Sequence, residues 1–362
     1  MTIERTDYQE VPAGAALADQ AHLGASGLEG VTHNGARPAL DGESHQVSER
    51  HSPPESGAGV WSSGGALFGL PFRPSSALRS GRPVQTWRAT DLRDDSEVVI
   101  KTAPLGAISS AVWMRLQHDV EALARIEAPS FAAPVEVSAR SGVGYLVMPF
   151  VPGVSLEARL RERALDVDET LEIALGVLRA LREAHACRVL HRNVKPENVI
   201  GPGAGRLNSA VLIDFGLARG SLIQAPQQEE LLRTARYVSP EQAGLLARPV
   251  DERSDLYAVG IMLFECLAGA APFEAQTVGQ LLRSHLTIAP PVLRDLGLNV
   301  PRALDEFVQR LLAKDPRDRY QSAEAALSDG VEIAAARERG IEEPALVIGL
   351  HDSRSTLVEP TL

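Results

Sequence analysis

The sequence predicts an α+β fold in which a small, β-rich part is followed by a larger helical part. The segments VQTWRATDL at 84–92 and VVIKTA at 98–103 are strand-like, flank a charged turn and are typical of a β-hairpin. Beyond Ser155, apolar residues recur mostly with helical spacing, as at 171–185. The chain has 362 residues, of which 44% are hydrophobic, so a sizeable core can form.

Composition excludes several classes of protein. The net charge of −11 and the pI near 5.4 argue against a general nucleic-acid binder. Two cysteines, Cys187 and Cys266, are too few for a disulfide scaffold or a Cys-rich zinc module. No signal peptide is evident, and the longest apolar stretch, at 256–273, contains Glu265 and is typical of a buried helix. We therefore expect a cytoplasmic protein without a membrane partner.

Residues 1–60 predict a disordered, acidic tail that contains Gly and His. They hold eight Gly and four His, and nine acidic residues against three Arg give a net charge of −6. Such a segment buries too little apolar surface to offset the entropy lost on folding. The spacing of the four His fits no metal-ligand pattern, so a solvated tail is the better interpretation.

The other elements follow in order. Residues 61–106 are strand-like, 108–126 predict an amphipathic helix, and the apolar strand 144–151 precedes a Pro-Gly turn. Short strands and loops then carry the segments VLHRNVKPENVI and AVLIDFGLA. Further helices are expected at 255–269, 305–316 and 322–340, before an irregular C-terminal segment.

Several short motifs stand in a fixed order along these elements. They are EVVIK at 97–101, MPFV at 148–151, HRNVKPEN at 191–198, DFG at 214–216, SPE at 239–241, DERSDLY at 251–257 and KDPRDRY at 314–320. The ordered series resembles the eukaryotic-like (Hanks-type) serine/threonine protein kinases of bacteria over about residues 78–335. The resemblance implies a bilobal protein-kinase fold. Its N-lobe, with one regulatory helix, would span 61–151, its C-lobe 152–336, and a linker or tail 337–362.

The resemblance assigns one set of residues to ATP. Lys101 would hold the α- and β-phosphates, because a mobile ammonium can follow phosphate oxygens. Asp119 stands where similar kinases have the Glu that pairs with this lysine, and its helical register turns it inward. It equally fits a solvated helix charge. Of the glycine-rich loop above the phosphates only Gly81 remains, so we expect weaker binding or another pose. The gatekeeper and hinge beside adenine would be Met148, Phe150 and Val151.

A second set would carry catalysis and bind magnesium. Lys195 would steady the γ-phosphate, and Asn198 and Asp214 would hold Mg²⁺. The family's catalytic Asp, which accepts or orients the substrate hydroxyl proton, is replaced by Asn193. An amide cannot take a proton at neutral pH, and loss of a general base typically lowers the rate by about 10²–10⁴-fold.

The resemblance also gives structural roles to residues around the activation segment. Glu241 is expected to form a buried pair with Arg319, and Asp255 to cap the backbone of the catalytic loop. Arg192 would receive a phosphate, but the segment 219–236 offers only Ser221 and Thr234 as hydroxyls. Because Thr234 would contact the catalytic loop, we expect little control by phosphorylation there. The resemblance also assigns structural roles to His191, Phe215 and Gly216.

Two hypotheses for function follow. The departures at Asn193, Asp119 and the glycine-rich loop favour a pseudokinase-like module that binds ATP-Mg and regulates a protein partner in a signalling pathway. The retained Lys101 and Asp214 support the alternative, an active kinase that transfers the γ-phosphate to protein hydroxyls. A purely structural domain would not need these metal- and phosphate-binding residues together.

The C-terminal residues 345–362 carry a further resemblance. They are similar to the connector that joins such kinase domains to a following NTPase domain in large bacterial signalling proteins. The chain would then be a fragment of a multidomain protein or a shortened form of one. The alternative interpretation is a C-terminal tail that carries no information on further domains.

Overall fold

The structure is a computed structural model, and it describes residues 69–80, 84–126, 128–201, 210–215 and 228–352. The tail at 1–60, for which the sequence predicts disorder, lies outside these residues. So do two of the candidate site residues, Gly81 and Gly216.

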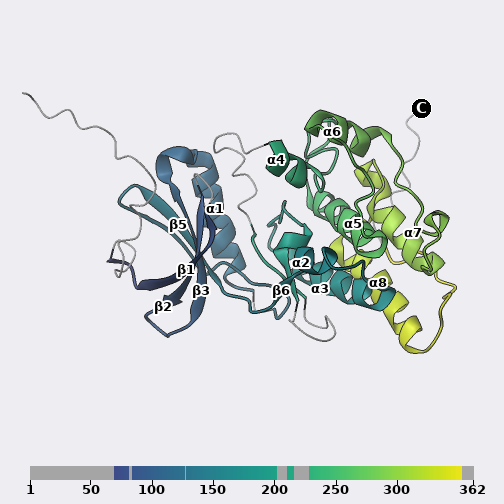
Figure 1. Cartoon of the computed structure of the whole chain (residues 1–362), viewed down its shortest axis with the longest axis horizontal. Coiled ribbons are helices and arrows are strands. Elements are labelled where there is room, and N and C mark those ends of the chain that lie inside the picture. The colour runs from purple at the N-terminus through teal and green to yellow at the C-terminus, as the bar shows by residue number, and fades with distance from the viewer. Residues whose placement is uncertain (1–68, 81–83, 127, 202–209, 216–227, 353–362) are drawn as a thin grey trace, which may run out of the picture. The chain divides into compact units, whose positions relative to one another are not determined.

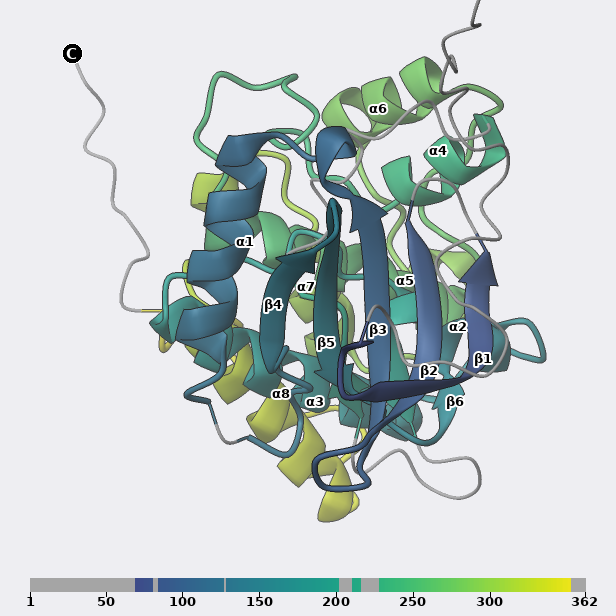
Figure 2. The ribbon, with the colours of Figure 1, turned by 90° about the vertical axis from the view of Figure 1, so that its left-hand side faces the viewer.

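A five-stranded antiparallel sheet forms the N-terminal lobe together with one long helix, α1 (Figure 1). The strand order is β1-β2-β3-β5-β4. The hairpin predicted at 84–103 is confirmed as β2 and β3, and α1 lies beside β4 (Figure 2). The bounds are β1 Phe72–Ser80, β2 Gln85–Asp91, β3 Glu97–Pro104, the short 3₁₀ helix η2 Leu105–Ala107, α1 Ser110–Leu123, β4 Glu136–Arg140 and β5 Val143–Pro149.

Alternation along β3 gives the sheet two different faces. Val98 and Ile100 are buried in a cluster with Phe72 and Val147 on one face. Neighbouring residues in β3 point to the opposite face, so Val99 and Lys101 lie on the side that also carries α1. The sheet therefore presents one lysine on a largely apolar face.

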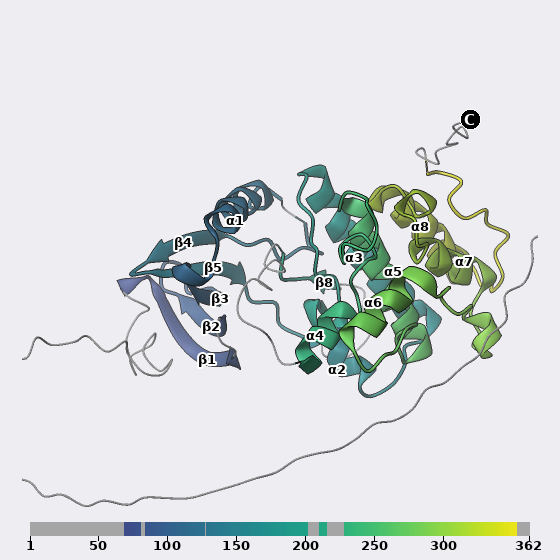
Figure 3. The same cartoon turned by 90° about the horizontal axis from the view of Figure 1, so that it is seen from above.

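The C-terminal lobe is mostly helical and has a small sheet, in the order β6-β7-β8, on its N-terminal side. The long helix α3 packs against α5 and α8, and α4 lies beside α6 (Figure 3). The bounds of the first half are β6 Val154–Ser155, α2 Leu156–Leu160, α3 Val167–Ala186, η3 Pro196–Asn198, β7 Val199–Gly201, β8 Val211–Leu212 and α4 Gln228–Ala235. Those of the second half are α5 Glu252–Ala268, α6 Val278–Thr287, η5 Arg294–Leu296, α7 Arg302–Leu311, η6 Pro316–Asp318 and α8 Ala323–Glu338.

The helices begin and end where the sequence provides caps. At the start of α3, Asp166 accepts a hydrogen bond from the Glu169 N–H and the Glu169 side chain accepts one from the Asp166 N–H. Helix α5 is buried on nearly every side and ends at Gly269, which adopts a positive φ of 74°. A side chain at Gly260 would place its Cβ 2.8 Å from Leu311, so this glycine lets α5 approach α7 closely.

The described part of the segment after α8, residues 339–352, has no helix or strand, as expected, but it packs back onto the C-terminal lobe. Leu346 and Ile348 contact the main core. Asp352 is buried and accepts hydrogen bonds from the Arg310 guanidinium at 3.1 Å and from the Gln321 N–H at 3.0 Å. The sequence did not indicate these contacts. In the described part of the chain, no helix has the length and apolar character needed to cross a membrane.

Candidate active site

A cavity of about 270 Å³ lies between the sheet of the N-terminal lobe and the C-terminal lobe. Most of its wall is apolar, and the described residues that give it charge are Lys101 and Asp214. An apolar slot that ends in a few charged groups suits a ligand with a flat apolar part and a polar end. The lining residues are Leu78, Thr86, Val99, Lys101, Ala132, Met148, Pro149, Phe150, Val151, Gly153, Ile200, Ile213 and Asp214.

The end of β5 and the two residues that follow it bring together the predicted gatekeeper and hinge residues. Met148 is buried, and Phe150 and Val151 line the cavity. The Phe150 N–H donates to the Glu97 carbonyl at 3.0 Å, and Pro149 has no N–H. Val151 therefore provides the hinge N–H that is available to a base in the cavity.

Lys101 is paired with Asp214 across the cavity. Both side chains are largely shielded from solvent, with 17% and 15% of their surface exposed. Burial by itself would raise the pKa of Asp214, but the charge and the hydrogen bond of Lys101 hold this pKa below its usual value. Asp214 is thus a carboxylate, held on a backbone with a positive φ of 75°.

The structure does not bring Asp119 into contact with Lys101. Asp119 lies on α1, is buried, and accepts a hydrogen bond at 2.9 Å from Arg115, one helical turn earlier. The pairing expected for these two residues is therefore not formed. The reason is that a local partner at i−4 holds the short Asp side chain, while Asp214 takes the ammonium.

Asp255 organises the predicted catalytic loop, the segment HRNVKPEN at 191–198, from the start of α5. Its carboxylate accepts the N–H groups of His191 at 2.8 Å and Arg192 at 2.6 Å. The His185 ring nitrogen Nε2 lies 2.9 Å from the same carboxylate. Burial would raise the pKa of Asp255, but the hydrogen bond and charge of His185 lower it below its usual value. The loop backbone, which has a positive φ of 62° at Arg192, is held by these bonds.

The two asparagines of this loop contact each other. Asn198 Nδ2 donates to the Asn193 carbonyl at 2.8 Å, and the Asn198 carbonyl accepts the Ile213 N–H at 2.9 Å. The second bond connects the catalytic loop to the residue before Asp214. Lys195 forms an ion pair at 2.6 Å with Glu197, a residue for which the sequence indicated no role.

A stack of rings supports this site from behind. Phe215 packs edge-on against Phe131 and His191, with ring centroids 4.2 Å and 4.3 Å away. His191 Nε2 lies 3.0 Å from the Ile213 carbonyl, and Nδ1 accepts the Asn193 N–H at 3.2 Å. Burial lowers the pKa of His191, so the ring is neutral and donates through Nε2.

The pair expected between Glu241 and Arg319 is present and fully buried. Two guanidinium nitrogens donate to the carboxylate at 2.6 Å and 3.0 Å, and Ser254 donates to it at 2.7 Å. Thr234, by contrast, does not make the expected contact with the described residues of the catalytic loop. It is exposed at the end of α4 and has no side-chain hydrogen bond to the described residues of the catalytic loop, because its segment is helical and is held elsewhere.

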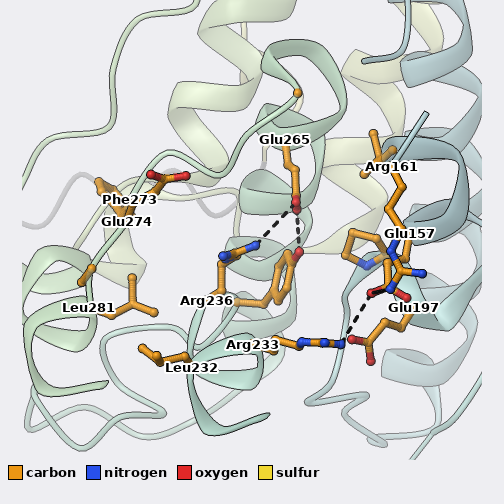
Figure 4. Close-up of a pocket in the computed structure, with 15 residues that line it drawn as sticks. Glu157, Arg161, Glu197, Leu232, Arg233, Arg236, Glu265, Phe273, Glu274 and Leu281 are labelled. Atoms are coloured by element: carbon orange, nitrogen blue, oxygen red, sulfur yellow. Dashed lines mark hydrogen bonds and ion pairs between the residues drawn. The ribbon is translucent and has the colours of Figure 1, made fainter. Parts of the chain in front are cut away.

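That segment forms one wall of a second, larger pocket, of about 500 Å³, beside the catalytic loop (Figure 4). Arg233 lies 3.9 Å from Glu157 of α2, and Arg236 lies 3.9 Å from Glu265 of α5. Tyr237 donates to Glu265 at 2.5 Å, and burial raises the pKa of both groups. Periodicity gave no reason to select these residues, because their elements meet only in the folded chain.

Comparisons with known proteins agree with this geometry. Residues 74–329 match the family model described as protein kinase domain. The serine/threonine-protein kinase PksC of Streptomyces coelicolor is 32% identical over 301 residues, which are 80% of this chain and 53% of that protein. The probable serine/threonine-protein kinase PknB of Lactococcus lactis is 32% identical over 231 residues, 63% of this chain and 36% of that protein. The chain thus spans about a third to a half of the length of these curated relatives.

Solved structures give the same fold. The kinase domain of Mycobacterium tuberculosis PknI aligns with a TM-score of 0.55 and 24% identity, covering 72% of this chain and 95% of that one. Rad53 1–466 in complex with AMP-PNP aligns with a TM-score of 0.59 and 20% identity, covering 72% and 64%. At these identities the likeness concerns the fold, and it confirms the predicted bilobal α+β architecture.

Proposed function

Because the chain belongs to the protein kinase domain family, we propose that it is a serine/threonine kinase-type module that binds ATP with Mg²⁺ in the cleft between its lobes. We further propose that phosphate transfer is weakened at Asn193, so that the module acts mainly on a protein partner in a signalling pathway. In this proposal the N-lobe spans 61–151 and the C-lobe 152–336. Residues 1–60 are a tail, and 337–362 are a linker or tail that begins in the last turn of α8 and packs on the C-terminal lobe as far as Asp352.

One observation carries the nucleotide proposal. Lys101 and Asp214 lie at one end of an otherwise apolar cavity that has a hinge N–H at Val151. An adenine ring would fit between the apolar wall and the hinge, and the ammonium of Lys101 would face the phosphates. The AMP-PNP in the Rad53 complex supports the same use of this fold.

The donor set also fits magnesium. Asp214 is ionised, and Asn198 Nδ2 donates to a backbone carbonyl, which leaves the amide oxygen as a ligand. No cluster of three or more His, Cys, Asp and Glu suited to a metal occurs among the described residues. In this proposal two side chains and the substrate phosphates hold the ion, a coordination that Mg²⁺ prefers. When bound, Mg²⁺ would neutralise charge on the phosphate oxygens.

Asn193 is the reason to propose weakened catalysis. The loop keeps its hydrogen bonds to Asp255 and Asn198, so the substitution changes chemistry more than position. An amide cannot accept the proton of a substrate hydroxyl. The expected loss of about 10²–10⁴-fold corresponds to about 3–5 kcal/mol of barrier.

The second candidate function is an active kinase. Lys195, Asn198 and Asp214 are all present, and the buried pair of Glu241 and Arg319 keeps the activation segment joined to the C-terminal lobe. Positioning and electrostatics supply most of the catalysis of phosphate transfer, so transfer without a base is feasible. Membership of the protein kinase domain family supports a protein as the partner in both cases.

The experiment that separates the two candidates is transfer of γ-labelled phosphate from Mg-ATP to the protein itself and to a generic protein substrate. Asn193→Asp and Asp214→Asn are measured beside the native chain. We expect little transfer by the native chain, more by Asn193→Asp, and none by Asp214→Asn. Strong native transfer that disappears in Asp214→Asn would instead establish an active kinase.

A further inference from the structure

Arg88 on β2 joins the sheet to the hinge of the cleft. Its guanidinium carbon lies 4.0 Å from the ring centroid of Phe150. The same guanidinium donates to the Glu97 carboxylate through Nε at 3.0 Å and through Nη2 at 2.6 Å and 2.7 Å. Glu97 in turn accepts the Phe150 N–H on its backbone carbonyl at 3.0 Å. Arg88, Glu97 and Phe150 thus form a closed set of contacts, which we call the hinge clamp.

The register of the sheet produces this arrangement. Arg88 pairs with Val99, and Thr90 pairs with Glu97, so Arg88 and Glu97 are diagonal neighbours on one face. Val99 and Thr86 on the same face line the cavity. The hinge clamp therefore lies on the face of the sheet that carries residues of the proposed adenine pocket, and it contacts the pocket wall through Phe150.

The exposure of the Arg88 and Glu97 side chains shows which contact of Arg88 affects the cavity. The side chains of Arg88 and Glu97 are 36% and 52% exposed, so their ion pair contributes little stability by itself. Stacking of the guanidinium on Phe150 restricts a ring that lines the cavity. The bond from the Phe150 N–H commits that donor to the sheet and leaves the N–H of Val151 for a ligand.

We propose that Arg88 is a positioning residue for the nucleotide base. It holds Phe150, and through it the Val151 N–H, in the geometry that receives adenine. The inference rests on the proposed ATP binding.

The test compares adenosine with Mg-ATP, because adenosine uses the base end alone. Dissociation constants are measured by titration calorimetry for the native chain, Arg88→Met, Arg88→Lys and Lys101→Met. An exposed cation–π contact is worth about 0.5–1 kcal/mol, so Arg88→Met should weaken both ligands by about two- to fivefold. Arg88→Lys keeps a cation over the ring and should restore part of the affinity. Lys101→Met should weaken Mg-ATP much more than adenosine, because the ammonium faces the phosphates.

Two further variants separate positioning from a general loss of stability. Arg73→Met removes an exposed arginine from β1 of the same sheet and should leave both dissociation constants unchanged. In a Phe150→Leu background the effect of Arg88→Met on adenosine should become smaller, since Arg88 acts through that ring.

The outcomes also separate this inference from the function on which it rests. Native-like adenosine binding by Arg88→Met would overturn the inference and leave ATP binding intact. An effect of Arg88→Met on Mg-ATP alone would also overturn it, because it would assign Arg88 to the phosphates. No binding of either ligand by the native chain would overturn both proposals.

Discussion

Replacing Arg319 by Met should destabilise the folded chain strongly without touching the cleft. The Arg319 side chain is completely buried, and its guanidinium donates five hydrogen bonds. Two go to Glu241, and the others go to the carbonyls of Ala313, Arg253 and Lys314 at 2.7 Å, 3.0 Å and 3.0 Å. The substitution therefore leaves one carboxylate and three carbonyls without this donor.

The size of the effect follows from these contacts. Breaking a buried ion pair by removing one partner typically destabilises a protein by about 3–5 kcal/mol. Each buried acceptor left unsatisfied adds to this, although not additively. At about 2–4 °C per kcal/mol, a loss of about 4 kcal/mol lowers the melting temperature by roughly 10 °C. The double variant Arg319→Met/Glu241→Gln should lose less, because no unpaired charge remains.

The assay is urea unfolding followed by circular dichroism, with Arg302→Met as the matched control. Arg302 pairs with Glu306 at 2.6 Å, but the two side chains are 73% and 42% exposed. Its removal should therefore change the free energy of unfolding by less than about 0.5 kcal/mol. A loss of less than 1 kcal/mol in Arg319→Met, similar to the control, would refute the reasoning.

The pair of Glu241 and Arg319 also predicts that the free energy of unfolding depends on pH. Burial would raise the pKa of Glu241, but the hydrogen bonds and charge of Arg319 hold it below its usual value of 4.5. A folded-state pKa that is lowered adds stability above pH 4.5, and this is lost as the pH falls through the folded value. The difference between the native chain and Arg319→Met should therefore shrink in acid. A difference that stays constant from pH 7 to pH 3 would contradict this.

Three other predictions concern the site. Asp214→Ala should abolish the magnesium-dependent thermal shift by ATP, because the ionised metal ligand is lost; an unchanged shift would exclude this residue as the ligand. Asp119→Glu should hold or raise the affinity for Mg-ATP, since one more methylene extends the carboxylate toward Lys101; a sharp loss, measured by calorimetry, would mean that the Asp is adapted to its place on α1. Arg233→Gln should speed hydrogen exchange of the α4 amides by severalfold, because the helix loses its contact with α2; unchanged exchange would show that apolar packing alone holds α4.

The sequence determined the architecture and much of the cleft. Alternation in β3 was enough to put Lys101 on the face opposite Val98 and Ile100, because strand residues alternate strictly between faces. The continuous apolar run of α5 predicted a helix buried on nearly every side. Motifs carried on adjacent elements, such as Asn198 and the strand before Asp214, meet in the structure as their order indicated.

The expected pair of Glu241 and Arg319 is formed, but only the tertiary structure decided how the charged groups near the cleft pair. Lys101 contacts Asp214, 113 residues away, and Asp119 turns to Arg115. The hinge clamp of Arg88 depends on a contact between β2 and a residue 62 positions later in the chain (150 − 88). A change of a few ångströms between two charged side chains decides whether such a pair forms, because hydrogen bonds and close ion pairs weaken steeply with distance. Helical and strand periodicity shows which face a residue occupies, and the packing of distant elements sets the separation on which the chemistry depends.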